Sequence, residues 1–204
     1  MVNSLLANKE AFTEEECSIC GKKLTQFGNK KLKDGILCRT CAKISSRWLS
    51  DEDYENRSVE DMQKHLQYRK ANLEKLNSFK TDKSVEGKFN LLIDRNKKQF
   101  LLSKRLDYIK ENPDLIPFDD IEEISIIEEN YFDDEGKDIF FEIKLNNDEI
   151  NKIRFRINEF PGIEENSDEY KKANDLAFVY LNGLIDEEDI IVENVLESED
   201  NKNE

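Results

Sequence analysis

Histidine is almost missing from this chain of 204 residues, since His65 is the only one. A catalytic pair built on histidine would depend on that single side chain, which falls in a predicted helix and is expected on its surface. The seven glycines are scattered and form no glycine-rich loop of the kind that holds phosphate groups. No nucleophile–base pair is evident either. We therefore predict a protein without hydrolase, transferase or redox activity.

Long apolar segments are also missing. No run of residues approaches the ~18 apolar positions that a membrane span needs. The first ten residues lack a basic segment followed by a long apolar stretch, so we expect no secretion signal. Hydrophobic residues make up 37 % of the chain and charged residues 38 %, which leaves material for a modest core. We expect a cytoplasmic protein whose thiols are reduced.

Charge is present in excess but is unevenly distributed. Residues 1–110 hold 23 Lys and Arg against 16 Asp and Glu, a net charge of +7. Residues 111–204 hold 8 against 30, a net charge of −22. We expect the main interaction surface to be electrostatic and to lie on the acidic half. Two other interpretations remain open: a merely solvated acidic surface, or docking of the acidic half on a basic half.

Four cysteines form two close pairs, Cys17-Ser-Ile-Cys20 and Cys38-Arg-Thr-Cys41, separated by seventeen residues. This spacing is typical of a zinc site, because each short turn can point two thiolates at one ion. Four sulfur ligands complete the tetrahedral coordination of Zn²⁺, so the predicted site is structural, with one zinc ion per chain. The alternative is two unrelated cysteine pairs, one of them a redox pair.

The residues around the cysteines predict a small module over residues 17–50. Gly21 suits the turn after the first pair. A hairpin is predicted with its turn at Gly28-Asn29, and a helix is predicted to begin after Cys41. This order predicts a treble-clef-like or zinc-ribbon-like arrangement, with the second pair at the start of the helix.

This part of the chain resembles a bacterial family of uncharacterised proteins with a four-cysteine zinc-finger domain. The resemblance covers about residues 17–75 and implies zinc binding. It rests on Cys17-Ser-Ile-Cys20-Gly-Lys-Lys, Lys31-Leu-Lys-Asp-Gly35, Cys38-x-x-Cys41-Ala-Lys and Ser58-Val-Glu-Asp61.

Hydrophobic periodicity divides the remaining chain into helical and strand-like parts. An acidic break at 51–56 precedes a linker helix within 57–80, which starts with the Ser58–Asp61 capping pattern. The full division is a polar leader at 1–16, the zinc module at 17–50, the linker helix at 57–80, a strand-rich domain at 86–185 and an acidic tail at 186–204. Strands are predicted at 87–93, 98–103, 115–118, 121–127, 138–145, 151–158 and, within the tail, 190–192. The final helix is predicted at 168–185.

The strand-rich domain resembles PH-like or GRAM-like domains in its order of antiparallel strands followed by a helix. The segment Ile116–Ile124 is similar to a strand–turn–strand segment of such domains. The alternative is another small α+β sheet. The resemblance implies a basic lipid-binding pocket, for which Lys88, Arg95, Lys97 and Lys98 are the candidates. Residues 86–204 carry a net charge of −18, however, so an anionic membrane is not the expected partner.

The overall prediction is an α+β protein: the zinc module, the linker helix, and a mainly antiparallel PH-like barrel or sheet with a C-terminal helix. The leading functional hypothesis is a non-catalytic adaptor that binds a protein partner. The first alternative is nucleic-acid binding through the basic module, and the second is an acidic decoy that mimics nucleic acid, as in some phage inhibitors. The candidate nucleic-acid contacts are Lys22, Lys23, Lys30, Lys31, Lys33, Arg39, Lys43 and Arg47.

Overall fold

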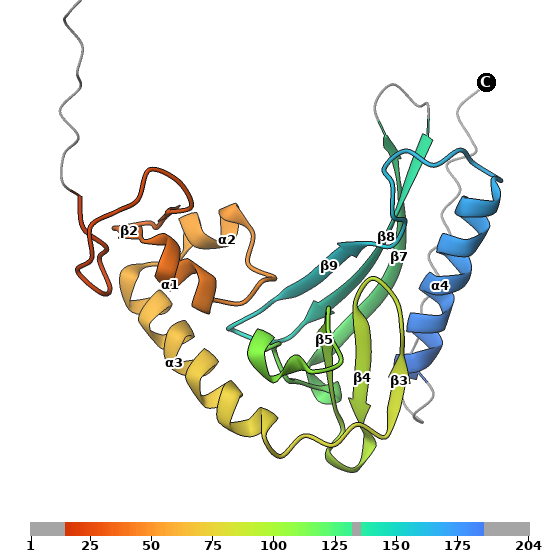
Figure 1. Ribbon diagram of the computed structural model, residues 1–204, viewed down its shortest axis with the longest axis horizontal. Coiled ribbons are helices and arrows are strands. Elements are labelled where there is room, and N and C mark those ends of the chain that lie inside the picture. Colours follow the sequence, from red (N-terminus) through yellow and green to blue (C-terminus); the bar gives the residue numbers. More distant parts are fainter. Residues whose placement is uncertain (1–14, 132–135, 186–204) are drawn as a thin grey trace, which may run out of the picture. The chain divides into compact units, whose positions relative to one another are not determined.

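The computed structural model describes residues 15–131 and 136–185, which form helices and antiparallel sheets, as the predicted α+β class requires (Figure 1). The chain divides into two compact units, Met1–Ala71 and Asn72–Glu204. Almost all of the predicted leader lies outside the described residues. The predicted acidic tail, with its strand at 190–192, lies outside them too.

The first unit combines a small antiparallel hairpin with helices. Its elements are β1 Lys30–Lys31, β2 Ile36–Leu37, α1 Arg39–Ile44, α2 Asp51–Asn56 and most of α3 Val59–Leu76. The predicted hairpin turn at Gly28-Asn29 is wrong. The turn comes later, where the N–H of Leu32 donates to the carbonyl of Gly35 at 2.8 Å. Asn29 instead donates its side-chain amide to the Thr25 carbonyl at 2.5 Å, which closes a separate loop before β1.

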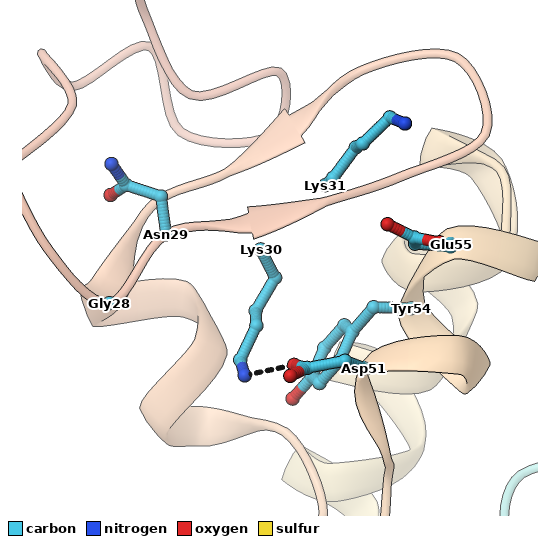
Figure 2. Close-up of a pocket in the computed structure, with 7 residues that line it drawn as sticks. All are labelled: Gly28, Asn29, Lys30, Lys31, Asp51, Tyr54 and Glu55. Atoms are coloured by element: carbon cyan, nitrogen blue, oxygen red, sulfur yellow. Dashed lines mark hydrogen bonds and ion pairs between the residues drawn. The ribbon is translucent and has the colours of Figure 1, made fainter.

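Helix α2 occupies the segment that was predicted as an acidic break. Ser50 and Asp53 form a capping box: the Ser50 hydroxyl accepts from the Asp53 N–H at 3.1 Å, and the Asp53 carboxylate accepts from the Ser50 N–H at 2.7 Å. The prediction failed because acids in a first turn favour a helix, through its positive N-terminal end. The helix lies beside β1, where the Lys30 Nζ is 2.5 Å from the Asp51 carboxylate (Figure 2).

Helix α3 begins where the capping pattern predicted. The N–H of Ser58 donates to the Asp61 carboxylate at 3.0 Å, and the N–H of Asp61 donates to the Ser58 hydroxyl at 3.1 Å. The helix ends at Leu76, and the boundary between the two units falls inside it, after Ala71.

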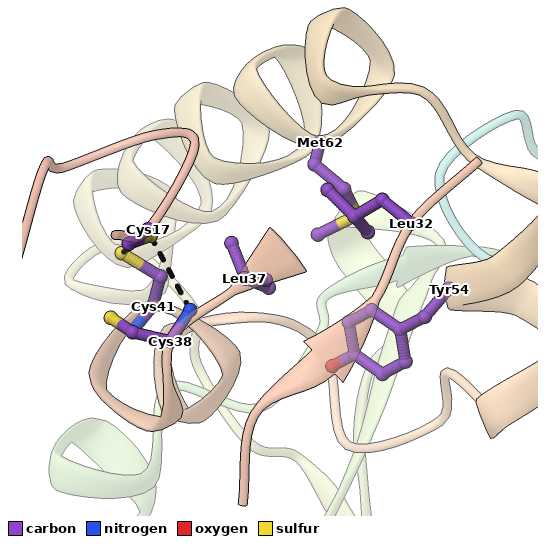
Figure 3. Packing of buried hydrophobic residues seen from close by; sticks show 7 residues of the cluster. All are labelled: Cys17, Leu32, Leu37, Cys38, Cys41, Tyr54 and Met62. Atoms are coloured by element: carbon purple, nitrogen blue, oxygen red, sulfur yellow. Dashed lines mark hydrogen bonds between the residues drawn. The ribbon is translucent and has the colours of Figure 1, made fainter. Parts of the chain in front are cut away.

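The hydrophobic core of the first unit includes the cysteine thiols. Figure 3 shows the hairpin, α1 and α3 contributing side chains to one cluster. Its buried members are Cys17, Leu32, Leu37, Cys38, Cys41, Tyr54 and Met62. Metal-site geometry and core packing in this unit therefore depend on each other.

Two polar side chains of α3 are buried, although His65 was predicted on the surface. The His65 Nε2 accepts from the N–H of Ser46 at 3.0 Å, and its side chain is fully buried. Arg69 is also buried, and its Nε donates to the carbonyl of Ile44, the last residue of α1, at 3.1 Å. The prediction about His65 was wrong because it took polarity for exposure. Both residues lie at helical spacing from the buried Met62, and this spacing was the available signal.

The second unit contains two antiparallel sheets and a long final helix. The four-stranded sheet has the order β3-β4-β5-β6, the three-stranded sheet has the order β7-β8-β9, and no closed barrel is found among the described residues. Every strand predicted within them overlaps an observed one, whereas β3 falls between the predicted linker helix and the predicted strand-rich domain. The bounds are β3 Lys83–Val85, β4 Asn90–Asp94, η1 Arg95–Lys97, β5 Gln99–Ser103, η2 Tyr108–Glu111, β6 Ile116–Pro117, η3 Phe118–Asp120, β7 Ile121–Tyr131, β8 Gly136–Leu145, β9 Lys152–Arg156 and α4 Asp168–Ile185.

Tyr180 of α4 connects the helix to both sheets. Its ring is fully buried and lies 5.5 Å, between centroids, from the rings of Phe141 and Phe155. Its hydroxyl donates to the carbonyl of Phe89 and accepts from the N–H of the same residue. A Cβ at Gly87 would overlap this hydroxyl, so the close approach of Tyr180 to the loop before β4 requires glycine at this position. One side chain thus joins the helix, the β3–β4 loop and the strands β8 and β9.

Candidate metal centre and charged surfaces

The first cysteine pair lies in a short loop closed by its own backbone. An antiparallel bridge between Glu16 and Lys23 brings the two ends of the loop together. The N–H of Gly21 donates to the Cys17 carbonyl at 2.9 Å. Gly21 has a φ of +67°, in the left-handed region that favours glycine. The conformation of this turn therefore requires glycine at position 21.

The second pair lies at the start of α1, which begins at Arg39 and not after Cys41 as predicted, because Cys38 caps it. Cys38 is the N-cap residue of this helix, and its sulfur accepts from the N–H of Cys41 at 3.5 Å. The N–H of Cys38 donates in turn to the sulfur of Cys17 at 3.3 Å. Backbone N–H groups thus point at the sulfurs from the hairpin side and from the helix, which stabilises negative charge on them.

All four sulfurs converge on one point. The Cys17 and Cys41 sulfurs are 3.9 Å apart, those of Cys20 and Cys38 are 3.7 Å apart, and all four lie within 4.8 Å of one another. These separations exceed a disulfide bond of about 2.05 Å. They match the ~3.8 Å edge of a tetrahedron whose metal–sulfur bonds are about 2.3 Å. The four cysteines therefore form a site that could bind a metal ion.

The ionisation of the thiols differs across the cluster. Burial raises the pKa of Cys17, but the N–H groups of Cys20 and Cys38 act against it, and the pKa falls to about 6. Burial raises the pKa of Cys41, and the other three cysteines raise it further. Four neighbouring thiolates repel one another, so a bound dication is what would allow all of them to ionise.

The N-terminal unit matches one known domain model. A domain of unknown function, DUF4428, matches residues 15–65. This match spans both cysteine pairs, in agreement with the predicted resemblance to an uncharacterised family. No curated protein and no solved structure matches the chain. The second unit lies outside the domain match, and its PH-like or GRAM-like character stays a prediction. Within the described residues, no helix has both the length and the apolar character needed to cross a membrane.

The eight candidate nucleic-acid contacts are spread over the first unit, and seven are exposed. They lie on the loop of the first pair (Lys22, Lys23), on the hairpin (Lys30, Lys31, Lys33), and on or just after α1 (Arg39, Lys43, Arg47). The half-buried Lys30 is the exception, because its Nζ pairs with Asp51 and lies 5.4 Å from the centre of the Tyr54 ring.

A shallow hollow beside β1 shows how mixed the charge of this surface is. It has a volume of about 380 Å³ and is lined by residues of both signs (Figure 2). Lys30 and Lys31 come from β1, whereas Asp51 and Glu55 come from α2. A nucleic-acid backbone approaching β1 would meet these acids as well, which weakens the phosphate attraction of the strand.

The candidate lipid pocket is not assembled. Arg95 and Lys97 belong to η1, where Arg95 pairs with Asp82 and Lys97 donates to Ser78. Lys88 lies in the β3–β4 loop, at the other end of the hairpin. Strand β4 separates Lys88, which precedes it, from Arg95 and Lys97, which follow it. These basic residues therefore do not form one pocket.

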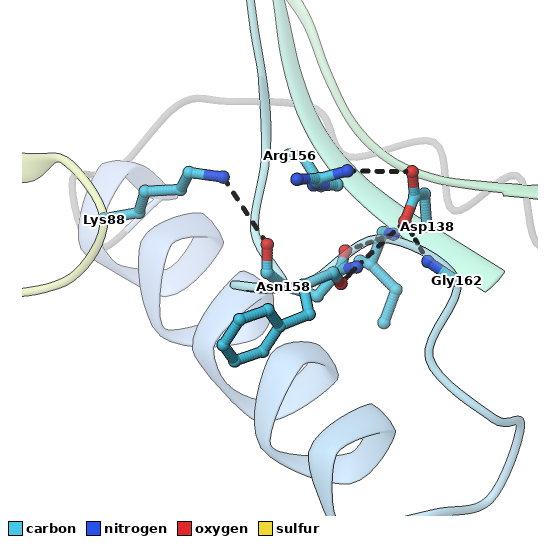
Figure 4. A network of polar contacts seen from close by, with 7 residues as sticks. Lys88, Asp138, Arg156, Asn158 and Gly162 are labelled. Carbon is cyan, nitrogen blue, oxygen red and sulfur yellow. Dashed lines mark hydrogen bonds and ion pairs between the residues drawn. The ribbon is translucent and has the colours of Figure 1, made fainter. Parts of the chain in front are cut away.

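Lys88 instead lies near a network around Asp138 (Figure 4). The Asp138 carboxylate accepts from Asn158 and from the N–H of Gly162, both at 2.9 Å, and from Arg156 at 3.3 Å. The Lys88 Nζ reaches the Asn158 carbonyl at 3.5 Å. Burial lowers the pKa of Lys88, and the nearby Arg156 lowers it further. This network fixes the end of β9 and was not anticipated from the sequence.

We expect acid to destabilise the first unit through His65. Burial lowers the pKa of His65 from 6.5 to about 3, with Arg57 and Arg69 adding to the effect. Stability from the neutral imidazole is fully present above pH 6.5 and is lost as pH falls toward 3, because only the unfolded chain then binds the proton. Between pH 7.5 and 5 the loss should be about 2 kcal/mol.

Urea unfolding followed by the fluorescence of Trp48, the only tryptophan, measures this loss. Protonation of the thiols also destabilises the unit in acid, so the control is His65→Gln, which keeps a hydrogen-bond acceptor but does not titrate. The difference between wild type and His65→Gln should shrink as pH falls. A constant difference from pH 7.5 to 5 would contradict the role of His65.

Proposed function

We propose that this protein is a non-catalytic, intracellular zinc-binding adaptor that binds a protein partner. The observation that carries the proposal is the closed four-sulfur cluster of Cys17, Cys20, Cys38 and Cys41. Cys₄ sites are typical of structural zinc, which has no open coordination position for a substrate. The ion would cross-link a unit whose core is small, and its binding would supply folding free energy. The short loop, hairpin and helix around the cysteines support a treble-clef-like interpretation.

The acidic half is the proposed partner-binding part, and its fold is the proposed PH-like domain. Its two antiparallel sheets and final helix support that interpretation. Four glutamates of β7 are exposed, Glu122, Glu123, Glu128 and Glu129. Two of them also form ion pairs within the sheet, Glu123 with Lys144 and Glu129 with Arg154, both at 2.7 Å. Such a surface attracts a basic partner and raises its association rate, an effect that salt screens. An anionic membrane is not proposed, because the predicted basic residues lie apart and the net charge opposes binding.

A second candidate is nucleic-acid binding by the first unit, favoured by the exposure of seven of the eight candidate contacts. The acids of α2 beside β1 count against it. In the acidic-decoy variant of the proposal, the partner is itself a nucleic-acid-binding protein. The decoy and the adaptor share one interaction surface and differ only in the partner.

The experiment is affinity purification of the full chain from nuclease-treated host lysate, followed by kinetics on the captured protein. Its association rate should fall about tenfold between ~50 and ~300 mM NaCl. Replacing the four β7 glutamates with glutamine should slow association at low salt. A charge-matched control replaces four exposed glutamates of the helices α2 and α3, Glu52, Glu55, Glu60 and Glu74. An association rate unchanged by salt and by the β7 variant would overturn the proposal. Capture from untreated lysate that is absent from nuclease-treated lysate would favour the nucleic-acid candidate.

A further inference from the structure

Three basic side chains of the second unit, distant in sequence, come together where its two sheets meet. They are Lys88 in the β3–β4 loop, Lys104 directly after β5, and Arg156, the last residue of β9. We call them the basic cluster. The two lysines belong to the four-stranded sheet and the arginine to the three-stranded sheet. Figure 4 shows the Lys88 side chain extending toward Arg156.

A buried aromatic contact fixes the backbone beside the basic cluster. The ring of Phe89, which follows Lys88, is buried. It lies 5.0 Å, between centroids, from the buried ring of Phe155, the residue before Arg156. The Lys104 Nζ lies 5.6 Å from the centre of the same Phe89 ring. The three cations are therefore held near one another by the core, and not by chance positions of flexible loops.

Arg156 has a hydrogen-bond donor that no described residue satisfies. Its Nη1 donates to the Asp138 carboxylate at 3.3 Å, but its Nε is buried and has no hydrogen-bond partner among the described residues. The Nε and Nη2 together form the edge of a guanidinium that binds oxyanions through two parallel hydrogen bonds. The side chain is 27 % exposed, so a ligand can approach the guanidinium from outside.

The two lysines of the cluster are not neutralised by carboxylates. The Lys88 Nζ reaches the main-chain carbonyl of Asn158 at 3.5 Å, and the Lys104 Nζ lies over the Phe89 ring. Neither lysine forms an ion pair with an acidic side chain in the described part of the chain. Both side chains are exposed, so their ammonium groups can turn toward a ligand.

The positive charges of the cluster repel one another. Burial lowers the pKa of Lys88, and the charges of Arg156 and Lys104 lower it further, while Asp138 and Glu159 act in the opposite direction. Asp138 is already engaged in its own network of hydrogen bonds. A bound anion would offset the repulsion, because a nearby opposite charge stabilises the charged form of each cation.

The number and the separate origins of these donors favour a phosphate monoester as the ligand. Such a group carries a charge of about −1.5 to −2 at neutral pH and has three terminal oxygens. Each cation of the cluster can meet one of these oxygens, whereas a carboxylate offers a single charge and two oxygens. A membrane lipid is not the expected source, because residues 86–204 carry a net charge of −18, which an anionic bilayer repels.

We propose that Lys88, Lys104 and Arg156 bind the phosphate monoester group of a soluble ligand. Arg156 holds the phosphate with the guanidinium edge that contains Nε, and the two lysines contact its oxygens from the other sheet. The site is separate from the proposed partner interaction, because the exposed glutamates of β7 take no part in it.

The test uses the full chain and phenyl phosphate, with binding followed by ¹H–¹⁵N NMR at constant ionic strength. The backbone signals of Lys88, Arg156 and Gly162 should shift in a saturable way. Phenyl sulfate is the comparison ligand, because it keeps the ring and the three terminal oxygens but carries a single charge. It should bind at least ~5-fold more weakly. Absence of a saturable shift up to ~20 mM phenyl phosphate would overturn the proposal.

Single substitutions assign the binding to the cluster. Lys104→Gln removes a cation without removing an ion pair, so it should leave the fold intact and weaken phenyl phosphate binding at least ~5-fold. The matched control is Lys98→Gln, which removes the same charge from an exposed lysine at the far end of β4 and should change the affinity less than ~2-fold. Arg156→Lys keeps the charge but loses the guanidinium edge, and it should also weaken binding.

Equal effects of Lys104→Gln and Lys98→Gln would reduce the binding to general electrostatic attraction and overturn the site. Equal affinity for phenyl phosphate and phenyl sulfate would overturn the choice of ligand. Cosedimentation with vesicles of phosphatidylcholine and phosphatidic acid, lost in Lys104→Gln, would overturn the assignment to a soluble ligand. The salt and glutamate experiments test the proposed function separately, because they change other residues and measure a protein partner.

Discussion

Cys38→Ser should release the metal ion and unfold the first unit while the second unit stays folded. Cys38 has three tasks in the structure: it faces the other sulfurs, caps α1 and belongs to the core cluster. Structural zinc supplies on the order of 10 kcal/mol to small metal-dependent folds, more than the remaining core of this unit can replace. Wild-type protein made without a metal-affinity tag should contain about one equivalent of zinc, and the variant should contain none.

Hydrogen exchange read by mass spectrometry localises the unfolding. Peptides from residues 17–65 should lose protection in Cys38→Ser, and peptides from β8 and β9 should keep it. The matched control is Thr40→Ser, an exposed position inside the same Cys-x-x-Cys turn, which should change neither zinc content nor exchange. Loss of protection throughout the chain would show that the second unit depends on the first. Another metal at full occupancy in wild-type protein would refute the zinc assignment but not the site.

Tyr180→Ala should destabilise the second unit by about 4 kcal/mol, the range found when a large buried aromatic side chain is truncated. The substitution removes the ring that touches Phe141 and Phe155, and it leaves the backbone groups of Phe89 without the hydroxyl. Tyr180→Phe should keep the packing and cost about 1 kcal/mol, the net value of an ordinary hydrogen bond. Chemical unfolding followed by circular dichroism gives both values.

The control for Tyr180→Ala is Val179→Ala, which changes the adjacent exposed residue of the same helix and should cost under about 0.5 kcal/mol. Trp48 fluorescence should report an unchanged first unit in all three variants. Similar losses for Tyr180→Ala and Val179→Ala would mean that helix propensity, and not the aromatic contact, determines the effect.

The sequence predicted the local features of the first unit better than its buried polar contacts. Spacing alone identified the four cysteines, and Gly21 was correctly placed in a turn, because both depend on neighbouring residues. The burial of His65 could not be predicted with the same certainty. It depends on Ser46, nineteen residues earlier, and on how the chain after α1 meets α3. Helix α2 was missed because acidic residues were interpreted without Ser50, their cap.

In the second unit, strand periodicity predicted most strands, and helical periodicity predicted the span of α4. It did not predict how those strands divide into two sheets, because the pairing of distant strands leaves no local pattern. The basic residues around Arg95 illustrate the same limit. They are close in sequence to Lys88, yet the length of strand β4 separates them from it. The network at Asp138 joins residues about twenty positions apart and gave no signal in composition or spacing.

The hydrogen bond from Phe89 to Tyr180 spans 91 residues and also sets an order of events during synthesis. Cys17 and Cys41 are only 24 residues apart, so the ribosome completes the metal site early, and the rest of that core follows with Met62. The second unit must wait until α4 has emerged, since its core has no Tyr180 before then. Until that moment β4, β5 and β8 expose apolar side chains, and the nascent chain then offers a binding surface to chaperones. During synthesis the first unit can therefore fold before the second unit, which cannot complete its core until α4 has been made.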